Sequence, residues 1–173
     1  MDMMGPRNMG PFSRQYHAYS MIYADEKAQN ANYGGKIFLP PSALQVLMNK
    51  PDIEYPMMFK LTNPVLSMST HAGVLEFTAP EGQCYVPSWI MSQLCLENGQ
   101  VIQVSYTTLP KASFAKFQPQ SANFIEDIGD HRAMLERHLR DYSCISKDDI
   151  IVVNYLNKDY KILIIEKISK KLI

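Results

Sequence analysis

The side chains in this sequence best suited to acid–base or metal chemistry are four histidines, His17, His71, His131 and His138. His131 and His138 lie seven residues apart, about two helical turns, so both could face one side and hold a metal ion. Arginines at positions 132, 137 and 140 surround this pair, and their charge would repel a cation. We therefore expect two polar positions on a surface helix and predict no metal site.

Three cysteines could act as nucleophiles, but their arrangement favours packing. Cys84, Cys95 and Cys144 are odd in number, widely separated and set among apolar residues, and the sequence contains no CxxC pair. This pattern favours reduced core thiols over disulfides or metal ligands. His71 could serve as a base, but no nucleophile stands in a recognisable relation to it, so we expect a structural or loop histidine.

Gly34 and Gly35 could be taken for part of a phosphate-binding loop. Neither a GxGxxG nor a GxxxxGK pattern follows them, so a tight turn or a close backbone approach is the better interpretation. The lysines at positions 167, 170 and 171 are typical of a solvated chain end. Because no group of residues forms a recognisable active site, we predict no catalytic residue, no cofactor and no enzymatic activity.

Composition limits the remaining classes of function. The chain has 173 residues, 46% hydrophobic and 20% charged, which is enough to fill a core. Seventeen basic and seventeen acidic side chains cancel, which argues against nucleic-acid binding. No apolar run approaches the roughly 20 residues that cross a bilayer, and no secretory or transit pattern is present, so we expect no membrane insertion and a cytoplasmic and nuclear location.

The elements that organise the first two thirds of the chain come from a unit that occurs twice. In residues 37–48 a short apolar strand is stopped by proline, and Ser42 is placed to cap a short amphipathic helix. Residues 84–94 repeat this order, with Ser88 in the place of Ser42. The repeat predicts two pseudo-symmetric halves of one small closed barrel built from short strands.

Beyond the barrel the pattern changes, and we divide the chain into four parts. Residues 1–12 have no period and should form a flexible tail, and residues 13–110 form the barrel lobe. Residues 111–122 contain Pro119 and lack a clear core period, which is typical of a linker or a boundary strand. In residues 123–173 we expect an α/β lobe: a helix capped by Asp130, then a hairpin, apparently truncated at its C-terminus.

Several blocks, in order and at family-like spacing, are similar to the N-terminal domain of the ubiquitin fusion degradation protein family. They cover most of the chain: Phe12–Tyr16, Gly34–Ile37, Pro40–Leu44, Tyr55–Asn63, Thr70–His71, Gly73–Phe77, Cys84–Pro87 with Trp89, and Lys116–Ser121. The resemblance implies a mainly β fold with α+β character, a double-psi β-barrel lobe followed by a smaller α/β lobe.

The resemblance also implies a function without catalysis. Proteins of this family are adaptors that bind ubiquitin chains and deliver marked proteins to the hexameric AAA ATPase valosin-containing protein for extraction, unfolding and degradation by the proteasome, including degradation from the endoplasmic reticulum. The segments by which they dock the ATPase and the partner cofactor, the nuclear protein localisation protein, follow the N-terminal domain. This sequence ends at Ile173, so we expect it to keep ubiquitin-binding surface and not to recruit the ATPase alone.

For the polyubiquitin-binding surface we predict the region between the lobes, with Phe114, Lys116 and Phe117 out of core register near the boundary. The alternative is that both phenylalanines only pack the lobes together. Two other functions remain open: a scaffold that binds the ATPase or a cofactor, and an enzyme on the same barrel, for which His71 with Glu76 or Cys84 would be the site.

Overall fold

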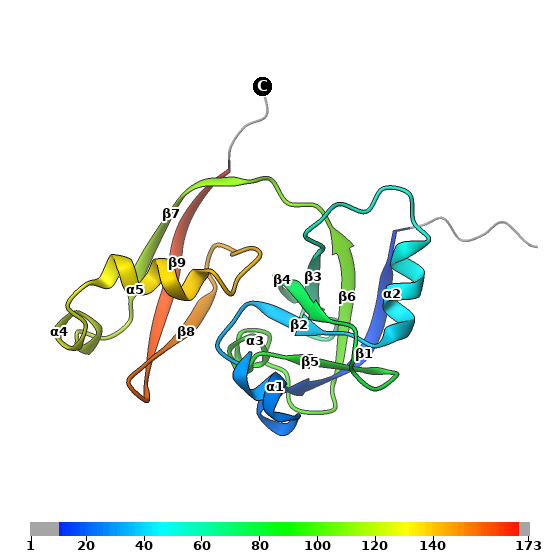
Figure 1. Cartoon of the computed structure of the whole chain (residues 1–173), viewed down its shortest axis with the longest axis horizontal. Helices are drawn as coiled ribbons and strands as arrows, with labels where there is room; N and C mark the ends of the chain where they lie inside the picture. The colour runs from blue at the N-terminus through cyan, green and yellow to red at the C-terminus, as the bar shows by residue number, and fades with distance from the viewer. Residues whose placement is uncertain (1–10, 170–173) are drawn as a thin grey trace, which may run out of the picture.

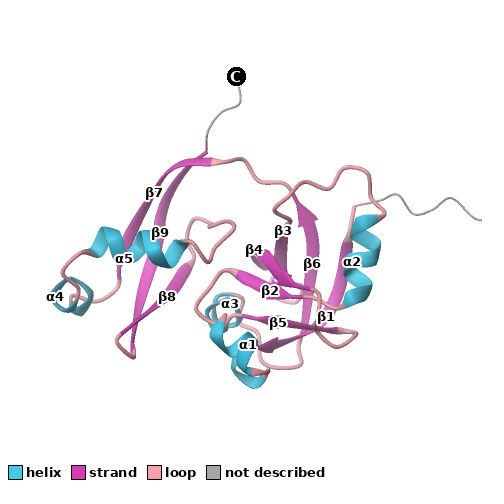
Figure 2. Cartoon of the chain, in the orientation of Figure 1, coloured by secondary structure: helices cyan, strands magenta, loops and turns pink. Residues whose placement is uncertain are grey.

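The computed structural model describes residues 11–169 as a mixed α+β fold, with a closed six-stranded barrel and a separate three-stranded sheet (Figure 1; Figure 2). The barrel strands follow the order β1-β5-β2-β4-β3-β6. Their bounds are Ser13–Ser20 (β1), Lys36–Phe38 (β2), Met58–Asn63 (β3), Met68–Glu76 (β4), Gln83–Val86 (β5) and Val101–Thr107 (β6). The prediction of a small closed barrel of short strands is therefore confirmed.

Alternation of apolar and polar residues builds the barrel core. In β3, Phe59 and Leu61 are fully buried while Lys60 between them is exposed, because successive side chains of a strand point to opposite faces. Phe12 is also buried, with 2% of its surface exposed, and its ring packs edge-on against Phe59. The predicted tail is thus wrong at Phe12, which the core holds in place. Residues 1–10 of that tail lie outside the described part of the chain.

The strand–proline–helix unit occurs twice, as predicted. β2 leads into helix α2 (Pro41–Met48), and β5 leads into helix α3 (Ser88–Gln93). Two further short helices, η1 (Met21–Tyr23) and α1 (Glu26–Asn30), separate β1 from β2. The strands of the two units form parallel pairs, β2 with β4 and β5 with β1.

The predicted serine caps are wrong. Pro40 and Pro87 occupy the positions before the two helices and offer no side-chain cap. The Ser42 hydroxyl instead donates to the Glu81 carboxylate at 2.5 Å. Ser88 donates through its backbone N–H and its hydroxyl to the side-chain oxygen of Asn32, at 2.8 and 2.9 Å. The serines therefore tie each helix start to a distant loop, a connection that local sequence does not reveal.

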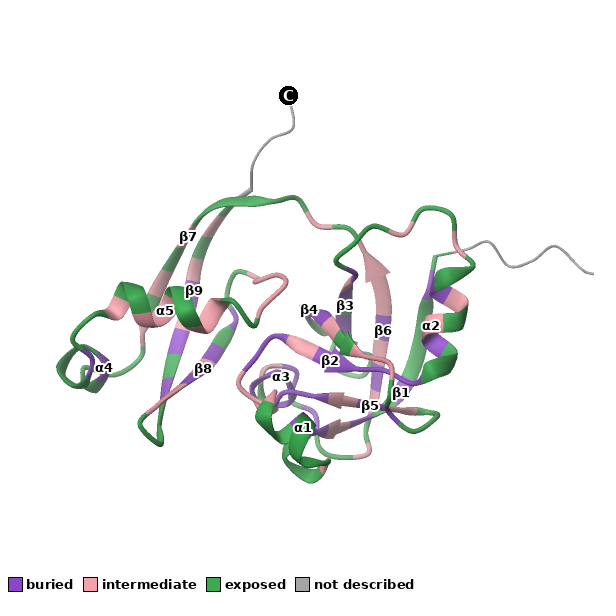
Figure 3. Ribbon diagram, viewed as in Figure 1, coloured by how far each residue is buried: buried purple, intermediate pink, exposed green. Residues whose placement is uncertain are grey.

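The second lobe contains the predicted helix and hairpin. Helix α5 (His131–Leu139) begins after Asp130, whose carboxylate accepts from the Ala133 N–H at 3.0 Å. The hairpin consists of β8 (Ile150–Tyr155) and β9 (Lys158–Ser169), and a short helix, α4 (Asn123–Asp127), precedes α5. Buried residues line β8 and β9, as the purple segments of Figure 3 show. Apolar side chains on one face of this hairpin thus form the core of the lobe.

The segment 111–122, expected to be a linker or a boundary strand, contains strand β7 (Ala112–Pro119). β7 pairs antiparallel with β9, which gives the sheet order β7-β9-β8. The lack of a clear core period in the segment agrees with its edge position, since no residue of β7 is fully buried. The three-stranded sheet therefore consists of the β8–β9 hairpin and a strand, β7, that precedes the hairpin in the sequence.

Candidate binding surfaces

Two glycines allow the lobes to touch directly. A Cβ atom added at Gly35 would lie 2.2 Å from Cδ1 of Tyr142, and one added at Gly73 would lie 2.3 Å from Oγ of Ser143. Neither distance is possible for non-bonded atoms, so the missing side chains create the space for residues 142 and 143 of the second lobe. The Gly34-Gly35 stretch thus serves close backbone approach, one of the two roles expected for it.

Aromatic and polar contacts complete the junction. The Trp89 ring lies 6.0 Å from the Tyr142 ring, and its Nε1–H donates to the Gly34 carbonyl at 2.8 Å. The Tyr142 hydroxyl donates to the Tyr33 carbonyl at 3.2 Å. From α3, Gln93 accepts at Oε1 from the Ile150 N–H at 3.0 Å and so ties the barrel lobe to β8. The lobes are joined by packing and hydrogen bonds of both main chain and side chains.

A buried carboxyl group lies in the same interface. Asp149 accepts a hydrogen bond from the Thr70 hydroxyl of β4, and only 3% of its surface is exposed. Burial raises the pKa of Asp149 to about 7, with a smaller contribution from Asp148, while the Thr70 hydrogen bond acts in the opposite direction. The contact between Thr70 and Asp149 is therefore sensitive to pH near neutrality.

His71 lies beside this contact and bonds across the lobes. Its Nδ1 shares a hydrogen bond of 2.8 Å with the Ser146 hydroxyl. Burial lowers the pKa of His71, and the positive charges of Lys167 and Lys60 lower it further. Burial thus favours the neutral form of His71, and its bond to Ser146 gives it a structural role, one of the two alternatives predicted for it.

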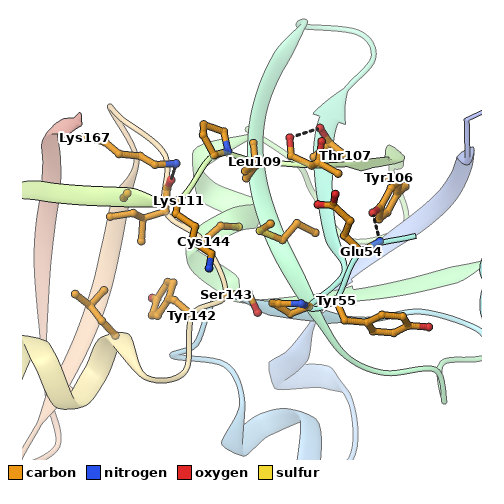
Figure 4. A pocket seen from close by; sticks show the side chains of 17 residues that line it. Glu54, Tyr55, Tyr106, Thr107, Leu109, Lys111, Tyr142, Ser143, Cys144 and Lys167 are labelled. Carbon is orange, nitrogen blue, oxygen red and sulfur yellow. Dashed lines mark hydrogen bonds between the residues drawn. The ribbon is translucent and has the colours of Figure 1, made fainter. Parts of the chain in front are cut away.

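A cleft of about 550 Å³ opens between the lobes (Figure 4). Its apolar walls include Tyr55, Pro56, Leu109, Pro110, Leu139 and Ile145. Figure 4 places Lys111 and Lys167 on one side and Glu54 with Tyr55 across from them. Lys167 donates to the Ile145 carbonyl at 3.0 Å, so the loop after α5 is held at the cleft wall. A cavity of this size and composition could accept several side chains of a ligand.

The three residues predicted to bind ubiquitin all lie on β7, outside the lining of this cleft. Phe114 is 50% exposed, and its cross-strand partner Ile168 is 47% exposed, so the two form a small apolar surface. Lys116 is exposed and lies opposite Glu166. Phe117 is partly buried and packs against the core. The structure therefore separates the exposed pair, Phe114 and Lys116, from Phe117.

Sequence reasoning placed a candidate site between the lobes but missed the residues that line the cleft. The break in pattern after Thr107 marks one wall. The other walls come from residues 54–58 and 142–145, which are distant in sequence and carry no shared motif. Only the folded chain shows that these segments meet.

The residues considered for catalysis do not form a site. His71 bonds Ser146, Glu76 pairs with Lys27 on α1, and Cys84 is fully buried, which raises the pKa of its thiol. Within residues 11–169 no group of three or more His, Cys, Asp or Glu side chains could hold a metal ion. Each candidate side chain is engaged in local packing or pairing instead.

The cysteines are all free, as predicted, but not all lie in the core. Cys84 is buried, and burial raises the pKa of Cys144 to about 11. Cys95 is exposed, contrary to expectation. Cys95 follows the last turn of α3 and has a positive φ of 54°. The chain leaves the helix at this residue, so the side chain of Cys95 does not continue the apolar face of α3.

Comparison with known families covers nearly the whole described chain. Residues 12–110 match the model of the ubiquitin fusion degradation protein UFD1, N-terminal subdomain 1, and residues 111–171 match that of N-terminal subdomain 2. The chain belongs to the ubiquitin fusion degradation protein family. This confirms the resemblance noted in the sequence.

Individual relatives agree with this membership. The chain is 45% identical over 157 residues to the human ubiquitin recognition factor in ER-associated degradation protein 1, covering 90% of this chain and 50% of the relative. It is 40% identical over 167 residues to the ubiquitin fusion degradation protein 1 homolog of Dictyostelium discoideum, covering 95% and 50%. The Saccharomyces cerevisiae ubiquitin fusion degradation protein 1 is 44% identical over 161 residues, covering 93% and 44%. The chain thus spans about half the length of the curated relatives it matches.

None of the helices within residues 11–169 is long and apolar enough to span a membrane.

Proposed function

We propose that this chain is a ubiquitin-chain-binding adaptor module that helps to deliver ubiquitinated proteins for unfolding and degradation, and that it is not an enzyme. The observation that carries the proposal is the match to both N-terminal subdomains of a family whose human member is named a ubiquitin recognition factor in ER-associated degradation. The expected partners, as in full-length members of the family, are the ATPase valosin-containing protein and the nuclear protein localisation cofactor, in cytoplasm and nucleus.

We further propose that the barrel is of the double-psi type and that the two lobes divide at residue 110. The parallel pairs β1–β5 and β2–β4, each following a repeated strand–proline–helix unit, support a pseudo-symmetric barrel. The change from barrel strands to the β7-β9-β8 sheet supports the division.

For the ubiquitin-binding surface we retain Phe114, Lys116 and Phe117, with Phe114 and Lys116 as the direct contacts and Ile168 beside them. The exposed Phe114–Ile168 pair offers an apolar area, and Lys116 adds charge at its edge. Phe117, which packs inward, positions the strand. A surface this small binds one ubiquitin weakly, whereas a chain raises the local concentration of the next ubiquitin to roughly millimolar and increases avidity.

The test is an NMR titration of the labelled chain with single ubiquitin and with a chain of four. Binding on β7 predicts shifts at Phe114, Lys116 and Ile168 that saturate earlier with the chain. The variant Phe114→Ser should weaken binding, whereas Leu156→Ser, which changes an 82% exposed leucine at the β8–β9 turn, should not. A folded spectrum that shows no shifts with either ligand would overturn the proposed function, and shifts confined to another surface would overturn the β7 assignment alone.

A further inference from the structure

The interlobe cleft combines apolar walls with a lysine that has no partner within residues 11–169. The Lys111 ammonium makes no ion pair or hydrogen bond to the residues that the structure describes. In Figure 4 its side chain reaches into the cleft toward Cys144 and Ser143. Lys167, on the same side, is bonded to the Ile145 carbonyl and has no carboxylate beside it. This side of the cleft therefore carries positive charge that no acidic residue of the described chain neutralises.

The rest of the cleft lining is mostly apolar and aromatic. Tyr55 stands at the rim with 71% of its surface exposed, and the arch that joins β6 to β7 contributes Leu109 and Pro110. Glu54 is the acidic member of the lining, and it forms no ion pair with Lys111 or Lys167. An exposed aromatic side chain beside an apolar hollow is typical of positions that dominate binding energy in interfaces.

Contacts between the lobes position the walls of this cleft. Gly35 and Gly73 leave room for the loop that follows α5 to pack against the barrel. Lys167 binds the same loop through the Ile145 carbonyl. A site with walls already in place loses little conformational entropy when a ligand enters. The cleft is thus preorganised for a short extended ligand.

We propose that the interlobe cleft binds a short linear peptide segment of a partner protein in which an acidic side chain is flanked by large apolar residues. The carboxylate pairs with Lys111, assisted by Lys167, and the apolar neighbours lie against Tyr55, Leu109 and Ile145. Charge complementarity selects this occupant, since an uncharged apolar segment would leave Lys111 unpaired and a basic one would be repelled. This site is separate from the β7 surface and does not depend on ubiquitin binding.

The test uses a set of hexapeptides, capped at both ends and labelled with fluorescein, in which one Asp or Glu is flanked by Leu, Phe or Tyr. Each peptide has a counterpart with Asn or Gln in place of the acid. Fluorescence anisotropy measures the affinity of the 173-residue chain for each pair, and NMR locates the site. We expect acidic members to bind with shifts at Lys111, Cys144 and Ile145, and each amide counterpart to bind roughly tenfold more weakly.

Variants separate the cleft from general charge effects. Lys111→Glu and Tyr55→Ala change exposed side chains, so the fold is retained, and each should weaken the acidic peptides several-fold. Lys147→Glu makes the same charge change at an exposed lysine outside the cleft lining and should bind like the unchanged chain. The proposal would be overturned if Lys111→Glu and Lys147→Glu lost affinity equally, or if acidic and amide peptides bound equally well. NMR shifts confined to another surface, or no binding by any peptide, would overturn it as well.

Discussion

At the scale of single residues, Asp149 links the stability of the chain to pH. Its pKa rises from 3.8 to about 7 because the carboxyl group is buried at the Thr70 contact. A carboxyl group with a raised folded-state pKa binds a proton on folding, so the free energy of unfolding falls as pH rises through this window and then levels off. The slope approaches about 1.4 kcal/mol per pH unit. Urea unfolding at several pH values should show this fall, and Asp149→Asn should flatten it.

The effect of Asp149 is measured as the difference in the free energy of unfolding between the unchanged chain and Asp149→Asn at each pH. Burial lowers the pKa values of His71 and His138, so these histidines reduce stability as pH falls, which is the opposite sign. Both proteins contain them, and their contribution cancels in the difference. Parallel stability profiles for the unchanged chain and Asp149→Asn would show that Asp149 ionises as freely in the folded chain as in the unfolded one.

At the scale of elements, β7 separates two phenylalanines that look alike in the sequence. Phe117 packs against the core, whereas half of the Phe114 surface is exposed. Phe117→Ala should therefore lower the free energy of unfolding by about 1–3 kcal/mol, and Phe114→Ala should change it by less than about 0.5 kcal/mol. Urea unfolding of both variants measures this difference. Equal losses would mean that both rings pack the lobes, the alternative considered from the sequence.

The same strand shows how far the sequence predicts the fold. Helix α5 could be predicted because its cap, Asp130, and the N–H that it binds are three residues apart. For β7 the sequence left a linker and a boundary strand both open, and its pairing could not be predicted, because its partner strand β9 begins almost 40 residues after β7 ends. The cleft was harder still, because the segments that line it are far apart in the sequence and meet only in the folded chain. Local chemistry is readable in sequence, whereas contacts between distant segments depend on the folded shape.

At the scale of the whole molecule, the close approach of the lobes depends on Gly35. A methyl group there would overlap the Tyr142 ring, which is held by the Tyr33 carbonyl and packs on Trp89. Gly35→Ala should therefore cost about 1–3 kcal/mol in the free energy of unfolding, as overpacking does. Trp89 is the single tryptophan of the chain, so its fluorescence should also report the displaced ring. Gly129→Ala, where an added Cβ meets nothing within 4 Å, is the matched control.

A double-mutant cycle decides whether the cost arises at the contact between the lobes. Tyr142→Leu removes the ring that a methyl group at position 35 would strike, and it is destabilising by itself because it leaves a partly filled space. Gly35→Ala should then cost less in the Tyr142→Leu background than in the unchanged chain, because neighbouring sites do not contribute additively. Equal costs in both backgrounds would place the strain in the backbone at Gly35 itself. A reduced cost would show that this glycine sets how closely the two lobes pack, and with it the width of the cleft between them.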